Sequence, residues 1–130
     1  MFSHIVVGVT NFERALKFYV PIMDALEIRN RFIDEDKSWA AWESSIEPRP
    51  LFIIKHPYNQ KIHESGNGQM VAFMAKSRKT VDEVYQLALD LGGISEGIPQ
   101  LRPEYHQDYY GAYFRDLDGN KLCIVCHEIN

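Results

Sequence analysis

The chain has 130 residues, 45% of them hydrophobic and 25% charged, which is enough for one globular domain with a core of its own. A formal net charge of −4 with scattered basic residues excludes a nucleic-acid partner, because phosphate binding needs clustered Lys and Arg. No apolar run approaches the roughly 18 residues that a membrane span needs. The N-terminus resembles no secretion signal, so we expect a cytoplasmic protein with no membrane partner.

The chain begins with a pattern typical of a strand followed by a helix. Residues 4–9 are apolar and rich in β-branched side chains, as in a buried strand. Thr10 or Asn11 is placed to cap a helix, since apolar side chains recur at helical spacing over residues 15–26. Pro21 removes one backbone hydrogen bond, which predicts a kink or a restart of the helix there.

Three strands and a polar loop are predicted next. Residues 28–44 indicate two strands around a charged turn at 34–36, and residues 50–57 indicate a third strand bounded by prolines. Residues 58–69 are polar and contain two glycines, which is typical of a connecting loop.

The same order of elements then begins again. Residues 70–75 predict a strand, and residues 77–93 predict an amphipathic helix with Ser77 as its cap and two glycines as its stop. Further strands follow to the C-terminus, and Asp118-Gly119 predicts the tight turn of a hairpin.

Two alignments of the chain with itself make this repeat explicit. Placing His4 on Met70 aligns the first strand and the helix of each half without a gap. Placing Phe52 on Cys123 aligns the closing strands. Each half is too small to bury its own sheet face, so we predict two βαβββ modules that pack on each other.

Three stretches carry a resemblance to a known family. They are "HIVVGVTNFERALKFY", "GNGQMVAFMAKSRKTVDEVYQLALDLGG" and "LRPEYHQDYYGAYFRDLDGNKLCIVCH". Together with the spacing of the two modules, they make the chain resemble the vicinal oxygen chelate superfamily, the group of glyoxalases, bleomycin-resistance proteins and extradiol dioxygenases. The third stretch is typical of its small single-domain, glyoxalase-like branch.

The resemblance implies an α+β fold in which two βαβββ modules form an open, curled mixed sheet around a cavity. We expect one glyoxalase-like domain over residues 1–130, with module one at about 1–57, a linker at about 58–68 and module two at about 69–130. A homodimer is also implied, since members of this family often pair or exchange modules.

In catalytic members of the family, a divalent metal is held by His and Glu from the first and last strands of each module. The resemblance places these four positions on His4, Phe52, Met70 and Cys123, with Met70 where relatives carry His and Cys123 where they carry Glu. Sulfur ligands favour soft ions, but both residues also serve as apolar lining. The expected cofactor is therefore either none or a divalent nickel, zinc, iron or copper ion, with His4 and Cys123 as candidate metal ligands.

A loop and one acidic residue complete the candidate site. In the family, the loop "LRPEYHQDYY" lies over the mouth of the cavity, where Arg102, His106 and Tyr109 can bind a carboxylate or a phenol-like ligand. The alternative is that this aromatic loop covers a sheet edge or a dimer contact. Glu43 is the carboxylate of the first module that can reach inward.

The two cysteines form a C-x-x-C sequence, but a redox pair is not expected. Cys123 and Cys126 lie three apart in a predicted strand, so their side chains point to opposite faces of the sheet. A redox motif would also need a helix after it, and the sequence predicts none there.

Two classes of function are consistent with these residues. The first is a glyoxalase-like protein with a degenerate metal site, which binds a small organic ligand in the cavity. The alternative is a metal-dependent lyase, isomerase or dioxygenase that acts on a small chelating substrate. It would use His4, Met70 and Cys123, or take ligands from His106 and Glu43. A bound metal ion is the feature that separates the two.

Overall fold

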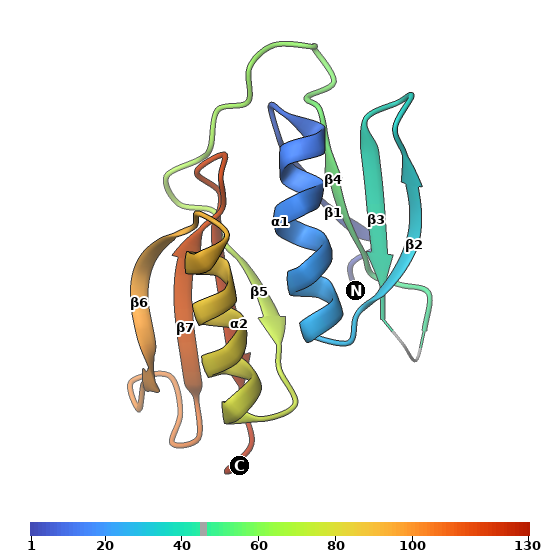
Figure 1. The fold of residues 1–130 in the computed structure, drawn as a ribbon. Helices are drawn as coiled ribbons and strands as arrows, with labels where there is room; N and C mark the ends of the chain where they lie inside the picture. Colours follow the sequence, from blue (N-terminus) through green and yellow to red (C-terminus); the bar gives the residue numbers. More distant parts are fainter. Residues whose placement is uncertain (45–46) are drawn as a thin grey trace. The chain divides into compact units, whose positions relative to one another are not determined.

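The computed structural model describes residues 1–44 and 47–130, and the chain divides into two compact units, Met1–Ser65 and Gly66–Asn130. Both units have the element order strand, helix and three strands (Figure 1). Each unit holds an open four-stranded mixed sheet with one helix, which confirms the predicted α+β fold of two βαβββ modules.

The first unit is built on a sheet with the strand order β1-β4-β3-β2. Strand β1 runs parallel to β4, and the other neighbouring strands are antiparallel. Its elements are β1 (His4–Gly8), α1 (Phe12–Ala25), β2 (Arg29–Asp34), β3 (Trp39–Glu43) and β4 (Leu51–Lys55).

Helix α1 begins where the sequence predicts and is continuous. The side chain of Asn11 accepts a hydrogen bond from the backbone N–H of Arg14 at 3.0 Å, which satisfies one free donor of the first turn. Of the kink or restart predicted at Pro21, the restart is wrong, since one helix spans Phe12–Ala25 with the proline inside it. Tyr19 and Ile22 are buried on either side of the proline, so packing holds both halves of the helix in place.

The two faces of this sheet have different neighbours. On the face covered by α1, the ring of Phe52 lies 5.5 Å from that of Tyr19 and 6.3 Å from that of Trp42. On the opposite face, a second cluster contains Ala41, Leu51 and Ile53, and Phe32 and Trp39 pack against it. Side chains of β4 therefore alternate between a helix-covered face and a helix-distal face.

The second unit repeats this plan with the strand order β5-β8-β7-β6. Strand β5 runs parallel to β8, and the other neighbouring strands are antiparallel. Its elements are β5 (Val71–Met74), α2 (Arg78–Asp90), β6 (Ile94–Leu101), β7 (Tyr110–Arg115) and β8 (Lys121–Cys126). Helix α2 packs against β6, β7 and β8 (Figure 1).

Local sequence signals of the second unit are confirmed. Ser77 caps α2 by accepting a hydrogen bond from the N–H of Thr80 at 3.1 Å. In the turn between β7 and β8, Asp116 Oδ1 accepts bonds from the N–H groups of Asp118 and Asn120, both at 2.9 Å. Gly119 has φ +82°, a conformation that suits glycine. Within the described ranges, neither helix is long and apolar enough to span a membrane.

The two thiols of β8 point away from each other, as predicted. Cys123 lies on the helix-distal face of the sheet in a cluster with Tyr113 and Val125, whereas Cys126 is outside that cluster. Both cysteines are buried and free, so no disulfide links them.

Candidate functional site

The candidate site is a cavity of about 450 Å³ in the second unit. It lies on the helix-distal side of the sheet. Lys121 is two residues before Cys123 in β8 and so shares its face, and Tyr113 is the register partner of Cys123. A cavity of this size is in the range of small-molecule sites. The residues that line it include Met70, Arg102, Tyr105, Tyr109, Tyr113 and Lys121.

Arg102 is the most strongly positioned side chain of this cavity. Its Nη2 donates to the carbonyl of Ile98 at 2.7 Å and its Nε donates to the carbonyl of Gly111 at 3.3 Å. The guanidinium carbon lies 4.8 Å from the centre of the Tyr113 ring, in a cation–π contact. A Cβ at Gly97 would come within 2.9 Å of Nη2, so the glycine leaves the space that the guanidinium fills.

A second cation approaches the same ring. Lys121 Nζ lies 5.5 Å from the centre of the Tyr113 ring. Glu96 also lines the cavity, but its carboxylate accepts a hydrogen bond from Arg115 Nε at 3.1 Å. No acidic side chain among residues 1–44 and 47–130 pairs with Arg102 or Lys121, so this cavity is positive on a chain with a net charge of −4.

Two phenols and a thiol form a neutral network beneath the two cations. The Tyr109 hydroxyl lies 2.9 Å from the Tyr113 hydroxyl and 3.5 Å from Cys123 Sγ. Burial raises the pKa of Tyr109, and its hydrogen bonds to Cys123 and Tyr113 raise it further. Burial also raises the pKa of Tyr113 and of the Cys123 thiol, although nearby Arg102 opposes this for both. All three groups are therefore protonated at neutral pH.

Met70, Arg102 and Tyr109 are predicted site residues that line the same cavity, and Cys123 lies directly behind Tyr109. His106 lies outside the lining. Its Nδ1 accepts a bond from the N–H of Asp108 at 3.1 Å, and its Nε2 is 2.8 Å from Nδ1 of His127.

The structure corrects the position predicted for Phe52. His4 is the register partner of Leu51 on β4, so it shares the face of Leu51 and Ile53, whereas Phe52 points to α1. Strand β4 starts with Leu51 opposite Glu43, as β8 starts with Lys121 opposite Arg115. The counterpart of Cys123 in the first unit is therefore Ile53, the next residue along from the predicted Phe52. A slip of one position turns each side chain to the other face of the sheet.

The donors at the four family positions do not fit a divalent metal. Ile53 has no donor atom, Met70 offers only a thioether, and the Cys123 thiol is hydrogen-bonded to Tyr109, so none of the three supplies the His or Glu of the family. His4 is left as the one ordinary ligand. In the part of the chain that the structure describes, no three His, Cys, Asp or Glu side chains gather as a metal site requires.

Glu43 is also engaged by other groups. It lies on the helix-distal face of the first unit and is buried, with Arg29 Nη2 2.9 Å from one carboxylate oxygen and Arg31 Nη1 3.4 Å from the other. Both oxygens are therefore held by arginines, which leaves a poor ligand for a metal ion.

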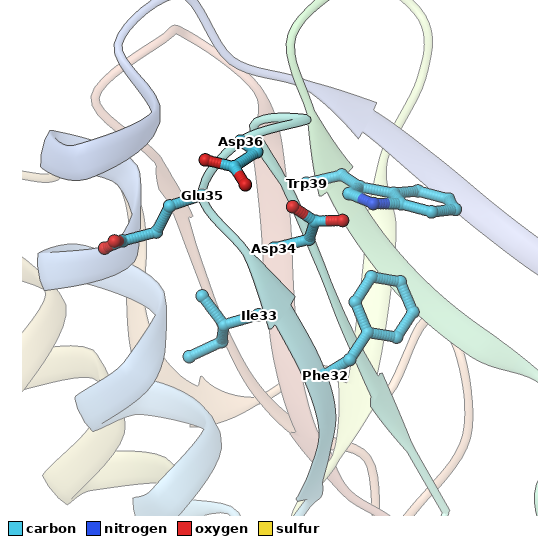
Figure 2. A pocket seen from close by; sticks show the side chains of 6 residues that line it. All are labelled: Phe32, Ile33, Asp34, Glu35, Asp36 and Trp39. Atoms are coloured by element: carbon cyan, nitrogen blue, oxygen red, sulfur yellow. The ribbon is translucent and has the colours of Figure 1, made fainter.

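In a larger cavity of about 630 Å³ at the β2–β3 hairpin, the lining side chains do not point toward one common space. Figure 2 shows the rings of Phe32 and Trp39 on one side of the hairpin, while Ile33 and Glu35 extend to the other side. Because successive side chains of a strand alternate, this surface surrounds the hairpin and presents no single binding face.

Sequence reasoning missed several residues of the site, among them Gly97, Tyr113 and Lys121. A signal for two of them was present. The Asp118-Gly119 turn places Tyr113 opposite Cys123, and strand alternation places Lys121 on the same face. Gly97 acts through its missing side chain, for which the sequence gives no signal.

The repeated module and its cavity define a class of two-module α+β proteins. The chain belongs to the Glyoxalase/Bleomycin resistance protein/Dioxygenase superfamily, whose family model matches residues 1–124. A comparison with curated proteins finds no match.

Solved structures agree with this assignment. A glyoxalase/bleomycin resistance protein from Albidiferax ferrireducens T118 is similar, with 33% sequence identity and a TM-score of 0.86 over 97% of this chain and 98% of that one. A glyoxalase/bleomycin resistance protein/dioxygenase family enzyme from Burkholderia phytofirmans PsJN shares the fold, with 16% identity and a TM-score of 0.70 over 97% and 98% of the two chains. A glyoxalase-related enzyme from Fulvimarina pelagi shares it at 14% identity and a TM-score of 0.72, over 97% and 87%.

Proposed function

We propose that this glyoxalase-like protein has lost the metal site of its family and binds a small organic ligand in the cavity of the second unit. The observation that carries this proposal is Arg102, which is fixed by two backbone carbonyls and the Tyr113 ring yet has no acidic partner in the described parts of the chain. Holding a guanidinium in one orientation costs side-chain entropy. A binding site gains from that cost, because a side chain held in place is already oriented for the ligand.

The composition of the cavity supports binding of an organic molecule. Ligand sites combine apolar and aromatic walls with a few fixed polar groups. Here Met70, Tyr105 and Tyr109 provide the walls, and Arg102 and Lys121 provide the polar groups.

The alternative is a metal-dependent lyase, isomerase or dioxygenase, and the donor chemistry stands against it. Such an enzyme uses the ion as a Lewis acid for a chelating substrate, which requires ligands that remain attached to the ion. The family positions offer His4, the thioether of Met70 and a Cys123 thiol hydrogen-bonded to Tyr109, with no carboxylate, which is a weak set of ligands for that task.

The test combines elemental analysis with ligand-observed NMR on tag-free protein. A panel of small acids, amides and amines, with and without an aromatic ring, is screened before and after treatment with EDTA. We expect binding of at least one compound that EDTA leaves unchanged and that Tyr113→Ala weakens. Near-stoichiometric nickel, zinc, iron or copper, or a panel without any binder, would overturn the proposal.

We also propose that residues 1–130 form a single domain that pairs as a homodimer, as the family resemblance implies. Light scattering of the purified chain tests the pairing. The mass of two chains supports it, and the mass of one chain contradicts it without affecting the fold.

A further inference from the structure

The charges around the cavity select the sign of its ligand. Arg102 and Lys121 both lie close to the centre of the Tyr113 ring, at 4.8 Å and 5.5 Å. The carboxylate of Glu96 is already paired with Arg115. An anionic group would therefore gain charge-assisted hydrogen bonds here, whereas an organic cation would be repelled.

The donors that Arg102 still offers favour a planar, two-oxygen acceptor. Its Nε and one N–H of Nη2 are used by the carbonyls of Gly111 and Ile98. The remaining donors are on Nη1 and Nη2, the two nitrogens that form the outer edge of the guanidinium. That edge can bind both oxygens of a carboxylate or two oxygens of a phosphate at once.

The walls beside this edge favour a ring. Tyr105 and Met70 are 62% and 43% exposed, so much of their apolar surface is left uncovered at the cavity. The rings of Tyr105 and Tyr109 have their centres 4.8 Å apart at an angle of 51°. An aromatic ring can pack against these side chains by offset or edge contacts, and a cavity of about 450 Å³ admits a one-ring compound.

Resting on the proposed function, we infer that the ligand of this cavity is a small aromatic acid, whose anionic group binds Arg102 and Lys121 and whose ring covers Tyr105 and Met70. Gly97 is a positioning residue in this arrangement, because its missing Cβ lets the guanidinium lie over the Tyr113 ring.

The probes are phenylacetate, its neutral amide, the cation phenethylamine, the ring-free acetate and phenyl phosphate, each titrated calorimetrically into the EDTA-treated protein. We expect phenylacetate to bind about tenfold or more tightly than the amide, because the amide cannot form the charge-assisted bonds. Acetate and phenethylamine should bind more weakly still. Phenyl phosphate reports whether the site prefers a carboxylate or a phosphate, and tight binding of either acid supports the inference.

Three variants test the named residues. Arg102→Met and Lys121→Met should each reduce the preference for phenylacetate over its amide, while Lys79→Met, an exposed lysine on α2, should leave it unchanged. Gly97→Ala should lower the affinity for phenylacetate with no change of charge and no effect on the amide. If Arg102→Met does not fold, Lys121→Met and Gly97→Ala still decide the question.

The outcomes separate this inference from the proposed function. If the amide or the amine binds as tightly as the acid, or if the preference for the acid survives in Lys121→Met and Gly97→Ala, the inference is overturned while ligand binding stands. If none of these compounds and no member of the wider panel binds, the proposed function itself fails.

Discussion

Replacement of Phe52 by alanine tests the face to which this residue points. Phe52 is 7% exposed and contacts the rings of Tyr19 and Trp42 in the core under α1. Removing a buried Phe side chain costs about 3–5 kcal/mol of unfolding free energy, and the lost ring pairs account for about 0.5–1.5 kcal/mol each within that loss. Against the roughly 5–15 kcal/mol that holds a domain together, Phe52→Ala is severe.

Urea unfolding followed by circular dichroism measures this loss, with Ile53→Val as the control on the helix-distal face of the same strand. The control should cost about 0.5–1.5 kcal/mol. The folded fraction of Phe52→Ala should bind cavity ligands with unchanged affinity, because Phe52 packs under α1 in the first unit and does not line the cavity of the second. A loss below about 1 kcal/mol, no larger than that of the Ile53→Val control, would refute the corrected register. If Phe52→Ala does not fold, Phe52→Leu provides a milder form of the same measurement.

Three further predictions concern titratable and capping groups. The hydrogen bond to Asp82 raises the pKa of Tyr110 to about 12, so the stabilisation of the fold by this bond is complete below about pH 10 and is lost as the pH rises towards 12. Tyr110→Phe should therefore flatten the fall of the urea midpoint at alkaline pH, and an unchanged slope would contradict this. Burial raises the pKa of the Cys123 thiol, so iodoacetamide should modify this thiol far more slowly at pH 8 than it modifies a free thiol. Mass spectrometry measures the rate, and rapid labelling would contradict the protonated network with Tyr109. Ser77→Ala removes the cap of α2 and should cost about 1 kcal/mol in urea unfolding, whereas no loss would show that the cap contributes nothing.

Much of the fold follows from signals that are local in the sequence. Asn11 and Ser77 each precede an apolar helical pattern and accept a backbone hydrogen bond at the predicted helix start. The Asp118-Gly119 pair sets the register of β7 and β8, and the three-residue spacing of Cys123 and Cys126 places them on opposite faces. These features depend on a few neighbouring residues, so the sequence suffices to predict them.

The register of β4 could not be read in the same way. Four consecutive residues, Leu51, Phe52, Ile53 and Ile54, are apolar and all are buried, so no alternation of polar and apolar side chains marks the two faces. Aligning Phe52 with Cys123 places identical residues, a Leu and an Ile, on either side of this pair. The strand pairing instead aligns Ile53 with Cys123.

The candidate site was predictable in part. Arg102 and Tyr109 were found because they lie in the loop that the family resemblance marks. The position of the Arg102 guanidinium depends on Gly97 in β6 and on the carbonyl of Gly111 and the Tyr113 ring in β7. Such an arrangement exists only once the sheet has formed, so its charge and geometry appear only in the structure.

The most direct test of metal-free ligand binding is an NMR titration of isotopically labelled, EDTA-treated protein with phenylacetate. We predict that the amide signals of Gly97, Arg102, Tyr113 and Lys121 shift together and saturate, and that added nickel or zinc changes neither the pattern nor the affinity. Shifts confined to the β2–β3 hairpin around Trp39, or shifts that appear only when a metal ion is added, would contradict the account.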